Sequence, residues 1–337
     1  MTLDNGFWGW FYKLLYPLEW LMTYILDMFH KVFVFFGMPD GPGFAWVLSI
    51  IFLVVLVRLC ILPLFIKQMK SMRRMQAIQP QLQKIQKKYK GKNDPASREA
   101  MSRETMKLYQ ENDANPMGSC LPALIQSPIF MTMFYVLSSV RYIANGSKKG
   151  FGAFDQATAQ SLQDTPVFNI HLSSMFTEVD AGGKITIGIF IALMCFTMFY
   201  SQFHNIRRNT PKAAQSGQTY RTQMMMALIF PFMYIFSGIA FPFAVLIYWL
   251  TNNTWTLCQT FWQVRNMPTP GSPAAEDKEK RDYKREQARR KREGLPTIEE
   301  EELAKAKAEA AEHKNKPQRY QPTRKNRAKK GSGSKKK

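Results

Sequence analysis

Long runs of apolar residues alternate with strongly polar segments along the chain. The first run, residues 44–66 (FAWVLSIIFLVVLVRLCILPLFI), can cross a bilayer as a helix, because about 20 apolar residues span its hydrocarbon core. Later runs are also long enough, and the last can cross twice, since Pro231 and Pro242 bracket a turn near residues 237–241. We therefore expect an all-α integral membrane protein with five spans, at about residues 44–66, 121–140, 185–203, 222–238 and 242–264.

Residues 1–43 have a different pattern. Polar side chains recur every three or four positions and form one stripe on a helix over residues 7–36: Lys13, Tyr16, Glu19, Thr23, Asp27, His30 and Lys31. Such an amphipathic helix, with Trp8, Trp10 and Trp20, is more typical of a membrane interface than of a span. We expect an uncleaved interfacial helix followed by a turn at residues 37–43 (GMPDGPG).

The polar segment 67–119 predicts a hairpin of two helices. Its first arm should continue from the membrane to Lys90, and its second should begin with Asp94 as N-cap and Pro95 at the first helical position, and run to about Glu111. Methionines recur every three residues on the first arm, and they suit either a surface that binds varied apolar partners or ordinary packing between the arms: Met69, Met72 and Met75.

Basic residues indicate the orientation in the membrane. Residues 67–120 carry 12 Lys and Arg against 5 Asp and Glu, residues 204–223 carry 4 against none, and residues 265–337 carry 23 against 12. Residues 141–184 are balanced, with 4 of each sign. Because cytoplasmic loops are rich in Lys and Arg, we expect the amino terminus outside and the carboxyl terminus in the cytoplasm.

The tail, residues 265–337, has high charge and little apolar content, so we expect it to be mostly disordered, with a short helix at residues 299–312. Its positive charge should attract polyanions, either ribosomal RNA or anionic lipid, and charge alone does not choose between them. The candidate contacts are Arg289, Arg290, Lys291, Arg292, Lys329 and Lys330.

Arg58 is the first candidate for function. It lies nine residues before Lys67, so its backbone is roughly 13 Å below the polar boundary, where a charge is costly. The expected spans contain no Asp or Glu, which disfavours a structural ion pair and leaves neutral polar groups on other helices as its company. We expect a polar, water-filled cavity that attracts anionic peptide.

Signatures of enzymes are missing from the sequence. HExxH, GxxxxGK[ST] and GxSxG do not occur, and the four cysteines form no CxxC pair. We expect no enzyme activity, no metal site and no cofactor.

Three stretches in order, VRLCILPLFIKQMKSMRRMQAIQPQLQKIQKKYK, NPMGSCLPALIQSPIFMTMFYVL and FPFAVLIYWLTNNTWTLCQ, resemble the YidC/Oxa/Alb-type membrane protein insertases over about residues 7–265. The missing lipobox and the uncleaved helix resemble an actinobacterial form. The resemblance implies five core helices around a hydrophilic groove open to cytoplasm and lipid. Some relatives have Thr where this chain has Val54. The expected groove residues are Arg58, Gln126, Gln202, Tyr248, Trp249 and Asn252.

The resemblance implies an insertase and chaperone for integral membrane proteins in the bacterial cell membrane, acting with or without the Sec translocon. Its implied partners are nascent membrane proteins, the ribosome, the Sec translocon and anionic lipids. Two alternatives remain from the residues alone. One is an anion channel or transporter that uses Arg58, and the other is a membrane anchor for RNA or the ribosome in which only the tail functions.

Overall fold

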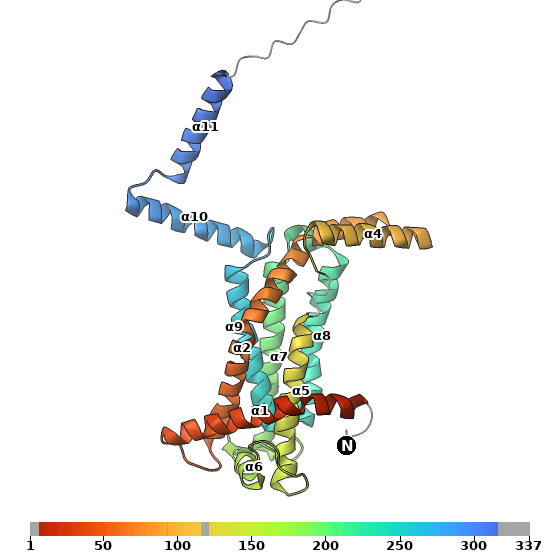
Figure 1. The fold of residues 1–337 in the computed structure, drawn as a ribbon, viewed down its shortest axis with the longest axis vertical. Coiled ribbons are helices and arrows are strands. Elements are labelled where there is room, and N and C mark those ends of the chain that lie inside the picture. The colour runs from red at the N-terminus through yellow and green to blue at the C-terminus, as the bar shows by residue number, and fades with distance from the viewer. Residues whose placement is uncertain (1–6, 93, 116–120, 316–337) are drawn as a thin grey trace, which may run out of the picture. The chain divides into compact units, whose positions relative to one another are not determined.

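The computed structural model describes residues 7–92, 94–115 and 121–315, and these are largely helical (Figure 1). The chain forms two compact units, Met1–Lys278 and Glu279–Lys337. The elements are α1 (Phe7–Phe35), α2 (Phe44–Ala77), α3 (Gln79–Lys88), α4 (Pro95–Glu111), α5 (Leu121–Ala144), α6 (Gln156–Gln163), β1 (Pro166–Val167), β2 (Ile170–His171), α7 (Ala181–Asn209), the 3-10 turn η2 (Lys212–Ala214), α8 (Gln218–Ala240), α9 (Phe243–Asn266), α10 (Pro273–Glu293) and α11 (Ile298–Asn315).

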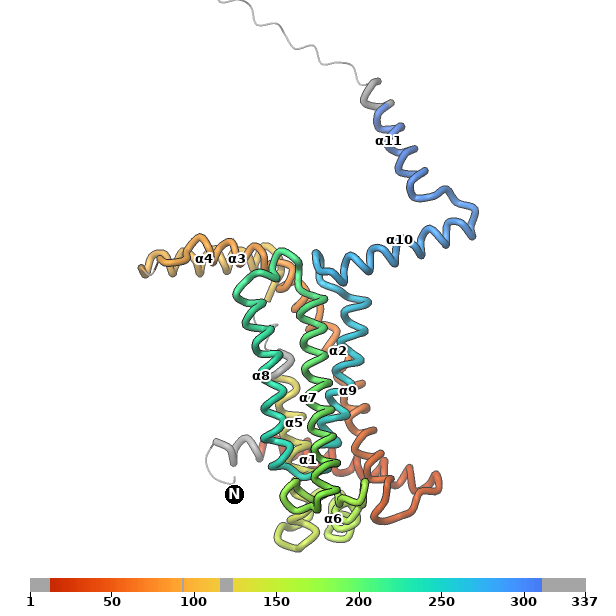
Figure 2. The backbone as a smooth tube through the Cα atoms, turned by 180° about the vertical axis from the view of Figure 1, so that it is seen from behind, coloured from red at the N-terminus to blue at the C-terminus, as the bar shows by residue number. Residues whose placement is uncertain are grey.

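Helices α2, α5, α7, α8 and α9 run side by side as a bundle and overlap the five expected spans (Figures 1 and 2). Within the described residues, α2, α7 and α8 are long and apolar enough to cross a membrane. Helices α5 and α9 do not meet that criterion, and α9 carries a run of Thr and Asn side chains. The structure is therefore that of an all-α membrane protein whose α9 is unusually polar for a bundle helix.

The first arm of the hairpin differs from the expectation. We expected one helix from the membrane to Lys90, but α2 ends at Ala77 and α3 starts at Gln79 after the junction residue Ile78. The cause is Pro80, which lacks an amide proton and whose ring collides with the carbonyl four residues earlier. The prediction of a single arm was wrong at this junction.

The second arm agrees with the expectation. Asp94 accepts a hydrogen bond from the amide of Ser97 at 2.8 Å, and this bond holds the pKa of the Asp94 carboxyl below its usual value. Helix α4 then ends at Glu111, as predicted. The arms pack through Ile78, Leu108 and their neighbours, so α3 and α4 form a hairpin with a small apolar core of its own.

Helix α1 crosses the bundle at a steep angle and contacts α2 and α5 (Figure 1). Part of its polar stripe faces the protein, since Glu19, Thr23 and His30 are buried. Apolar side chains are exposed at Leu14, Leu21, Met28 and Phe35, although Met22 and Leu26 are buried against the bundle. A helix that lies across a membrane bundle with exposed apolar side chains is placed to contact lipid, and its interfacial position stays a prediction.

The segment between α5 and α7 folds into a cap, which we name the α5–α7 cap (residues 145–180) and which contains α6, β1 and β2. It closes one end of the bundle by hydrogen bonds to two helix starts. The amides of Phe243 and Ala244 donate to the carbonyls of Ser174 and Leu172, at 2.9 and 2.8 Å. The indole of Trp46 donates to the hydroxyl of Ser161 at 2.9 Å.

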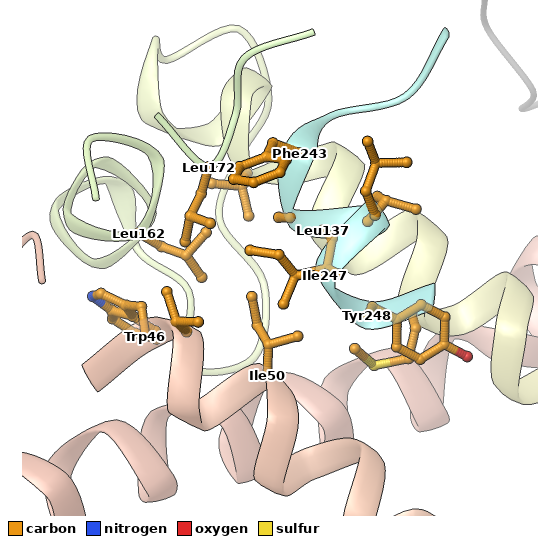
Figure 3. Close-up of a cluster of buried hydrophobic side chains, with 14 of the residues drawn as sticks. Trp46, Ile50, Leu137, Leu162, Leu172, Phe243, Ile247 and Tyr248 are labelled. Carbon is orange, nitrogen blue, oxygen red and sulfur yellow. The ribbon is translucent and has the colours of Figure 1, made fainter. Parts of the chain in front are cut away.

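The main core lies directly beneath this cap (Figure 3). Trp46 and Ile50 of α2 meet Leu162 and Leu172 of the cap and Phe243 of α9, and all five are fully or almost fully buried. Burial of large apolar side chains is the main stabilising contribution to a fold, and it is concentrated at this end of the bundle.

Three segments meet at the other end of the bundle, through uncharged groups. The side-chain oxygen of Gln76 on α2 accepts from the amide of Asn209 on α7 at 3.4 Å and from the hydroxyl of Thr269, beyond α9, at 2.5 Å. The backbone amide of Thr269 in turn donates to the side-chain oxygen of Asn209 at 2.8 Å. We call this triad, in which Asn209 and Thr269 are buried and Gln76 is half-buried, the 76–209–269 joint.

The tail also differs from the expectation. The short helix predicted at residues 299–312 lies within α11, but residues 273–293, expected to be disordered, form α10. Glu286 pairs with Arg289 and Arg290 one turn away, and Arg290 also pairs with Glu301 of α11. Glu, Lys, Arg and Gln are good helix formers, so such pairs support a helix that low hydrophobicity alone argued against.

Candidate substrate groove

Arg58 lies inside the bundle on α2 and is 9% exposed. Its Nε and Nη2 donate to the side-chain oxygen of Asn252 at 3.0 and 2.7 Å, and Nη2 also donates to the hydroxyl of Thr256 at 2.9 Å. Within the described part of the chain, Nη1 makes no hydrogen bond. The guanidinium is therefore fixed on one edge, while the Nη1 edge is left for another acceptor.

The two acceptors lie one helical turn apart on α9, so they face α2 together. The hydroxyl of Thr256 donates to the backbone carbonyl of Asn252 at 2.9 Å, which leaves its oxygen free to accept from Arg58. We expected Asn252 in the groove and missed Thr256. Its spacing of four residues from Asn252 is the signal that indicates it.

Two cavities adjoin the guanidinium. The smaller one has about 10 Å³ open to the centre of a water molecule, enough for one water, and is bounded by Arg58, Gln126, Tyr248 and Asn252 with apolar neighbours. The larger, of about 190 Å³, is lined by Arg58, Gln126, Gln68 and Thr256 among others. Leu64, which lines it, is 41% exposed, so this cavity reaches the surface of the bundle.

Four of the six expected groove residues thus lie together, namely Arg58, Gln126, Tyr248 and Asn252. The other two do not line these cavities. Trp249 is buried among rings of three elements, stacked on Phe130 at 5.5 Å between centroids and edge-on to Tyr234 and Phe241. Gln202 is exposed on α7. Trp249 has a packing position, and the adjacent residue Tyr248 is the one that faces Arg58.

The charge on Arg58 has no acidic partner within the described residues. Every group that bonds to it is neutral, as the absence of Asp and Glu from the expected spans predicted. A fixed positive charge held by neutral acceptors beside a cavity attracts anionic groups more strongly than a neutralised ion pair does.

The methionines of the hairpin region fall on the last turns of α2, before the α3–α4 hairpin. Met69 is buried, and Met75 packs on the core between α3 and α4. Met72 is half-buried. For Met69 and Met75 the structure favours packing over a recognition surface.

The expected tail contacts divide into three groups. Arg289 and Arg290 are engaged in ion pairs within the second unit. Lys291 and Arg292 are exposed at the end of α10. Lys329 and Lys330 lie outside the described residues.

These features define a class: an α-helical membrane protein with a partly polar groove that opens to the surface of the bundle. Residues 38–270 match the family described as 60Kd inner membrane protein. The chain is 57% identical to the membrane protein insertase YidC of Bifidobacterium longum (strain NCC 2705), over 97% of this chain and 98% of that protein. It is 38% identical to the membrane protein insertase YidC of Streptomyces avermitilis, over 77% of this chain and 59% of that protein.

A crystal structure entitled "Active YidC insertase crystal structure with the first transmembrane domain resolved" aligns with a TM-score of 0.42 at 23% identity, over 77% of this chain and 47% of that chain. The family match and the identity over nearly the whole length decide the assignment. The chain belongs to the 60Kd inner membrane protein family, and with its apolar helices it is a bacterial inner-membrane protein.

Proposed function

We propose that this chain is a membrane protein insertase, which moves the short polar end of a nascent membrane protein into the bilayer and releases its apolar segment to lipid. The observation that carries the proposal is the guanidinium of Arg58, buried in the bundle, held by neutral acceptors and open along one edge to a cavity. Relatives of high identity carry the name insertase, which supports the same activity here.

The geometry favours a groove over a channel. The smaller cavity beside Arg58 ends at Leu53 and Met133, which belong to the main core, and beyond them the α5–α7 cap closes the bundle. A substrate that enters near Arg58 is therefore led sideways past Leu64, toward lipid, rather than through the protein.

The energetics require no covalent chemistry. A segment of 20 apolar residues gains tens of kcal/mol by area when it leaves water, whereas moving a short polar end costs several kcal/mol. The insertase then has only to lower the barrier. Arg58 and water in the adjoining cavities shorten the path that the polar end travels through hydrocarbon.

The proposed orientation follows the charge pattern, with the α3–α4 hairpin and the tail in the cytoplasm and the α5–α7 cap outside. The hairpin and the basic tail then lie on the side where nascent chains arrive. The proposed partners are nascent membrane proteins, the ribosome, the Sec translocon and anionic lipid, and among the described residues Lys291 and Arg292 are exposed tail contacts.

Crosslinking during translation tests the groove. A photoreactive residue at Gln126 should capture the apolar segment of a small membrane protein, because Gln126 lines both cavities. The matched control is Gln202, a glutamine exposed on α7 away from those cavities. Equal capture from both positions would show contact with the bundle surface and would count against the groove.

Substitution of Arg58 tests the charge. Arg58→Lys should retain most insertion, and Arg58→Ala should impair substrates with acidic ends more than substrates with neutral ends. The measurement is protease protection of both substrate types in vesicles that carry each variant. Equal activity of all three proteins would contradict an electrostatic role and leave a groove that is only hydrated.

Deletion of the tail tests the ribosome contact. We would remove residues 279–337, which form the second unit. A cut closer to α9 would also remove Thr269 of the 76–209–269 joint and the start of α10, which both belong to the first unit. Co-sedimentation with ribosomes should fall, and the loss should be larger at low salt, since phosphate contacts are weakened by salt. Binding that is unchanged at low salt would exclude the tail as the contact.

A further inference from the structure

The tip of the β1–β2 hairpin has an unusual combination of residue type, backbone conformation and exposure. The register pairs Val167 with Ile170, which leaves Phe168 and Asn169 as the two turn residues. Both have positive φ, +52° and +63°, as in a type I′ turn. Asn suits that conformation, but a bulky Phe is strained there by about 1–3 kcal/mol.

The strain is not offset by burial of the ring in the core. Phe168 is 71% exposed, whereas Val167, Ile170 and Leu172 around it are buried. The hairpin is thus fixed at its base and presents one large apolar side chain at its tip. Its ring lies 6.3 Å from that of Phe190 on α7.

The depth of Phe190 relates this tip to the membrane. Lys184 is the last charged residue of α7 before Arg207, and the uncharged helix between them rises roughly 34 Å, slightly more than the hydrocarbon core. Phe190 is six residues beyond Lys184, so its backbone lies roughly 9 Å deeper. The ring of Phe168, next to that of Phe190, lies at the boundary of the hydrocarbon.

The surroundings on α7 face lipid as well. Ile185 and Ile189, on the same turns of α7 as Phe190, are 66% and 54% exposed, so this part of the helix has apolar side chains on its surface. Figures 1 and 2 show that α7 and α8 form the side of the bundle away from α1. Phe168 contacts Phe190 of α7, so the tip of the hairpin lies against a helix that is on this side of the bundle.

We infer that the tip of the β1–β2 hairpin inserts Phe168 among the acyl chains of the leaflet on the cap side, and so forms a second lipid anchor for the α5–α7 cap, in addition to α1. The partner is the lipid surface itself. The depth of Phe190 below Lys184, together with the ring contact between Phe168 and Phe190, selects lipid over a protein partner. The strained backbone conformation is maintained because it directs the ring at the bilayer.

The test uses the full-length protein in phosphatidylglycerol and phosphatidylethanolamine vesicles, with a nitroxide spin label at Phe168→Cys. The matched control is Gln160→Cys, an exposed position on α6 of the same cap. The background lacks the natural cysteines, Cys60, Cys120, Cys195 and Cys258. Power saturation then compares collisions with oxygen, which enters lipid, and with a water-soluble nickel chelate.

We expect the ratio of oxygen to nickel accessibility to be several-fold higher at position 168 than at position 160. A label at 168 that meets the nickel chelate as readily as the label at 160 would overturn the anchor, because the tip would then lie in water. A label shielded from both reagents would also overturn it, in favour of a protein partner.

Phe168→Asn separates the anchor from folding. Asn accepts positive φ, so this variant relieves the strain and should fold. A label on the neighbouring Asn169→Cys should then move from lipid toward water in the Phe168→Asn background, and should stay in lipid with Phe168→Leu. Identical accessibility in both backgrounds would show that Phe168 does not hold the tip in the membrane.

Discussion

The space between helices α2, α5 and α9 is packed very differently at the two ends of the bundle. Beneath the α5–α7 cap, Trp46, Ile50 and Phe243 are packed without exposure, and backbone amides of α9 are capped by the cap itself. Around Arg58, about 2.5 turns of α9 later, the same helices leave cavities of about 10 and 190 Å³ and a buried charge. The first end holds the helices together, and the second is kept incompletely filled.

The difference shows how a membrane bundle can tolerate an expensive arginine. A central Arg costs about 2.5–3.5 kcal/mol on insertion scales, and loosely filled space adds to that cost. Dense packing at the cap end offsets both. Stability and function are thus carried by different halves of the same three helices, and variants should separate them.

The largest expected effect is at the cap end. Phe243→Ala removes a fully buried ring and should lower the free energy of unfolding by about 3–5 kcal/mol, which thermal denaturation in detergent would reveal as a lower Tm. Its matched control is Phe65→Ala, which removes the same ring from the lining of the 190 Å³ cavity. Equal losses for both variants would break the distinction between the two ends.

The next effect is at the groove. Thr256→Val removes one acceptor from Arg58 and should reduce insertion of substrates with acidic ends, since a hydrogen bond to a charged group contributes about 1.5–3 kcal/mol. Thr254→Val is the control, because the exposed Thr254 hydroxyl bonds only to the carbonyl of Leu250 on its own helix. Insertion and Tm should be measured together, and a fall in Tm without a fall in insertion would contradict this role.

The smallest effect is a pH dependence of the cap end. His30 stacks on Trp46 with 3.9 Å between ring centroids, and burial lowers the pKa of His30, although Asp40, the Gly41 backbone and Asp27 oppose that shift. A lowered pKa means that protonation favours the unfolded chain. Stability from this group is present above pH 6.5 and is lost as the pH falls below that value.

The Tm should therefore decrease between pH 7.5 and pH 5, and His30→Gln should reduce this slope. His171→Gln, at an exposed histidine of the cap, serves as the control. Insertion activity per folded molecule should change less than Tm, because His30 is remote from Arg58. A slope that persists in His30→Gln would assign the pH dependence to other groups.

The sequence predicted the bundle and the core of the groove because both depend on patterns that are local or on one strong rule. Apolar runs of sufficient length give helices, and a charge amid them requires polar company, which made Asn252 a candidate partner of Arg58. The resemblance to the insertases singled out Gln126 and Tyr248. Thr256 was missed since a helical Thr normally bonds its own backbone, as this one also does. Only the structure shows its second bond.

Other errors have equally specific causes. Trp249 and Tyr248 are adjacent, so they point in different directions on α9, and the sequence alone did not show which of them faces α2. The cap is rich in small and polar residues, and its contacts join positions more than 60 apart, such as Leu172 and Ala244. Helix α10 was missed because its low apolar content indicates only that it has little apolar surface to bury. The helix is supported instead by ion pairs along its surface.

The 76–209–269 joint has a mechanical consequence. Because Gln76 lies on the same helix as Arg58, the hydrogen bond of 2.5 Å between Thr269 and Gln76 connects the segment after α9 directly to the helix that carries Arg58. The joint consists of hydrogen bonds between uncharged groups, so a change in ionic strength should not weaken it. A force on the segment that connects α9 to the tail would therefore act on α2, the helix that carries Arg58.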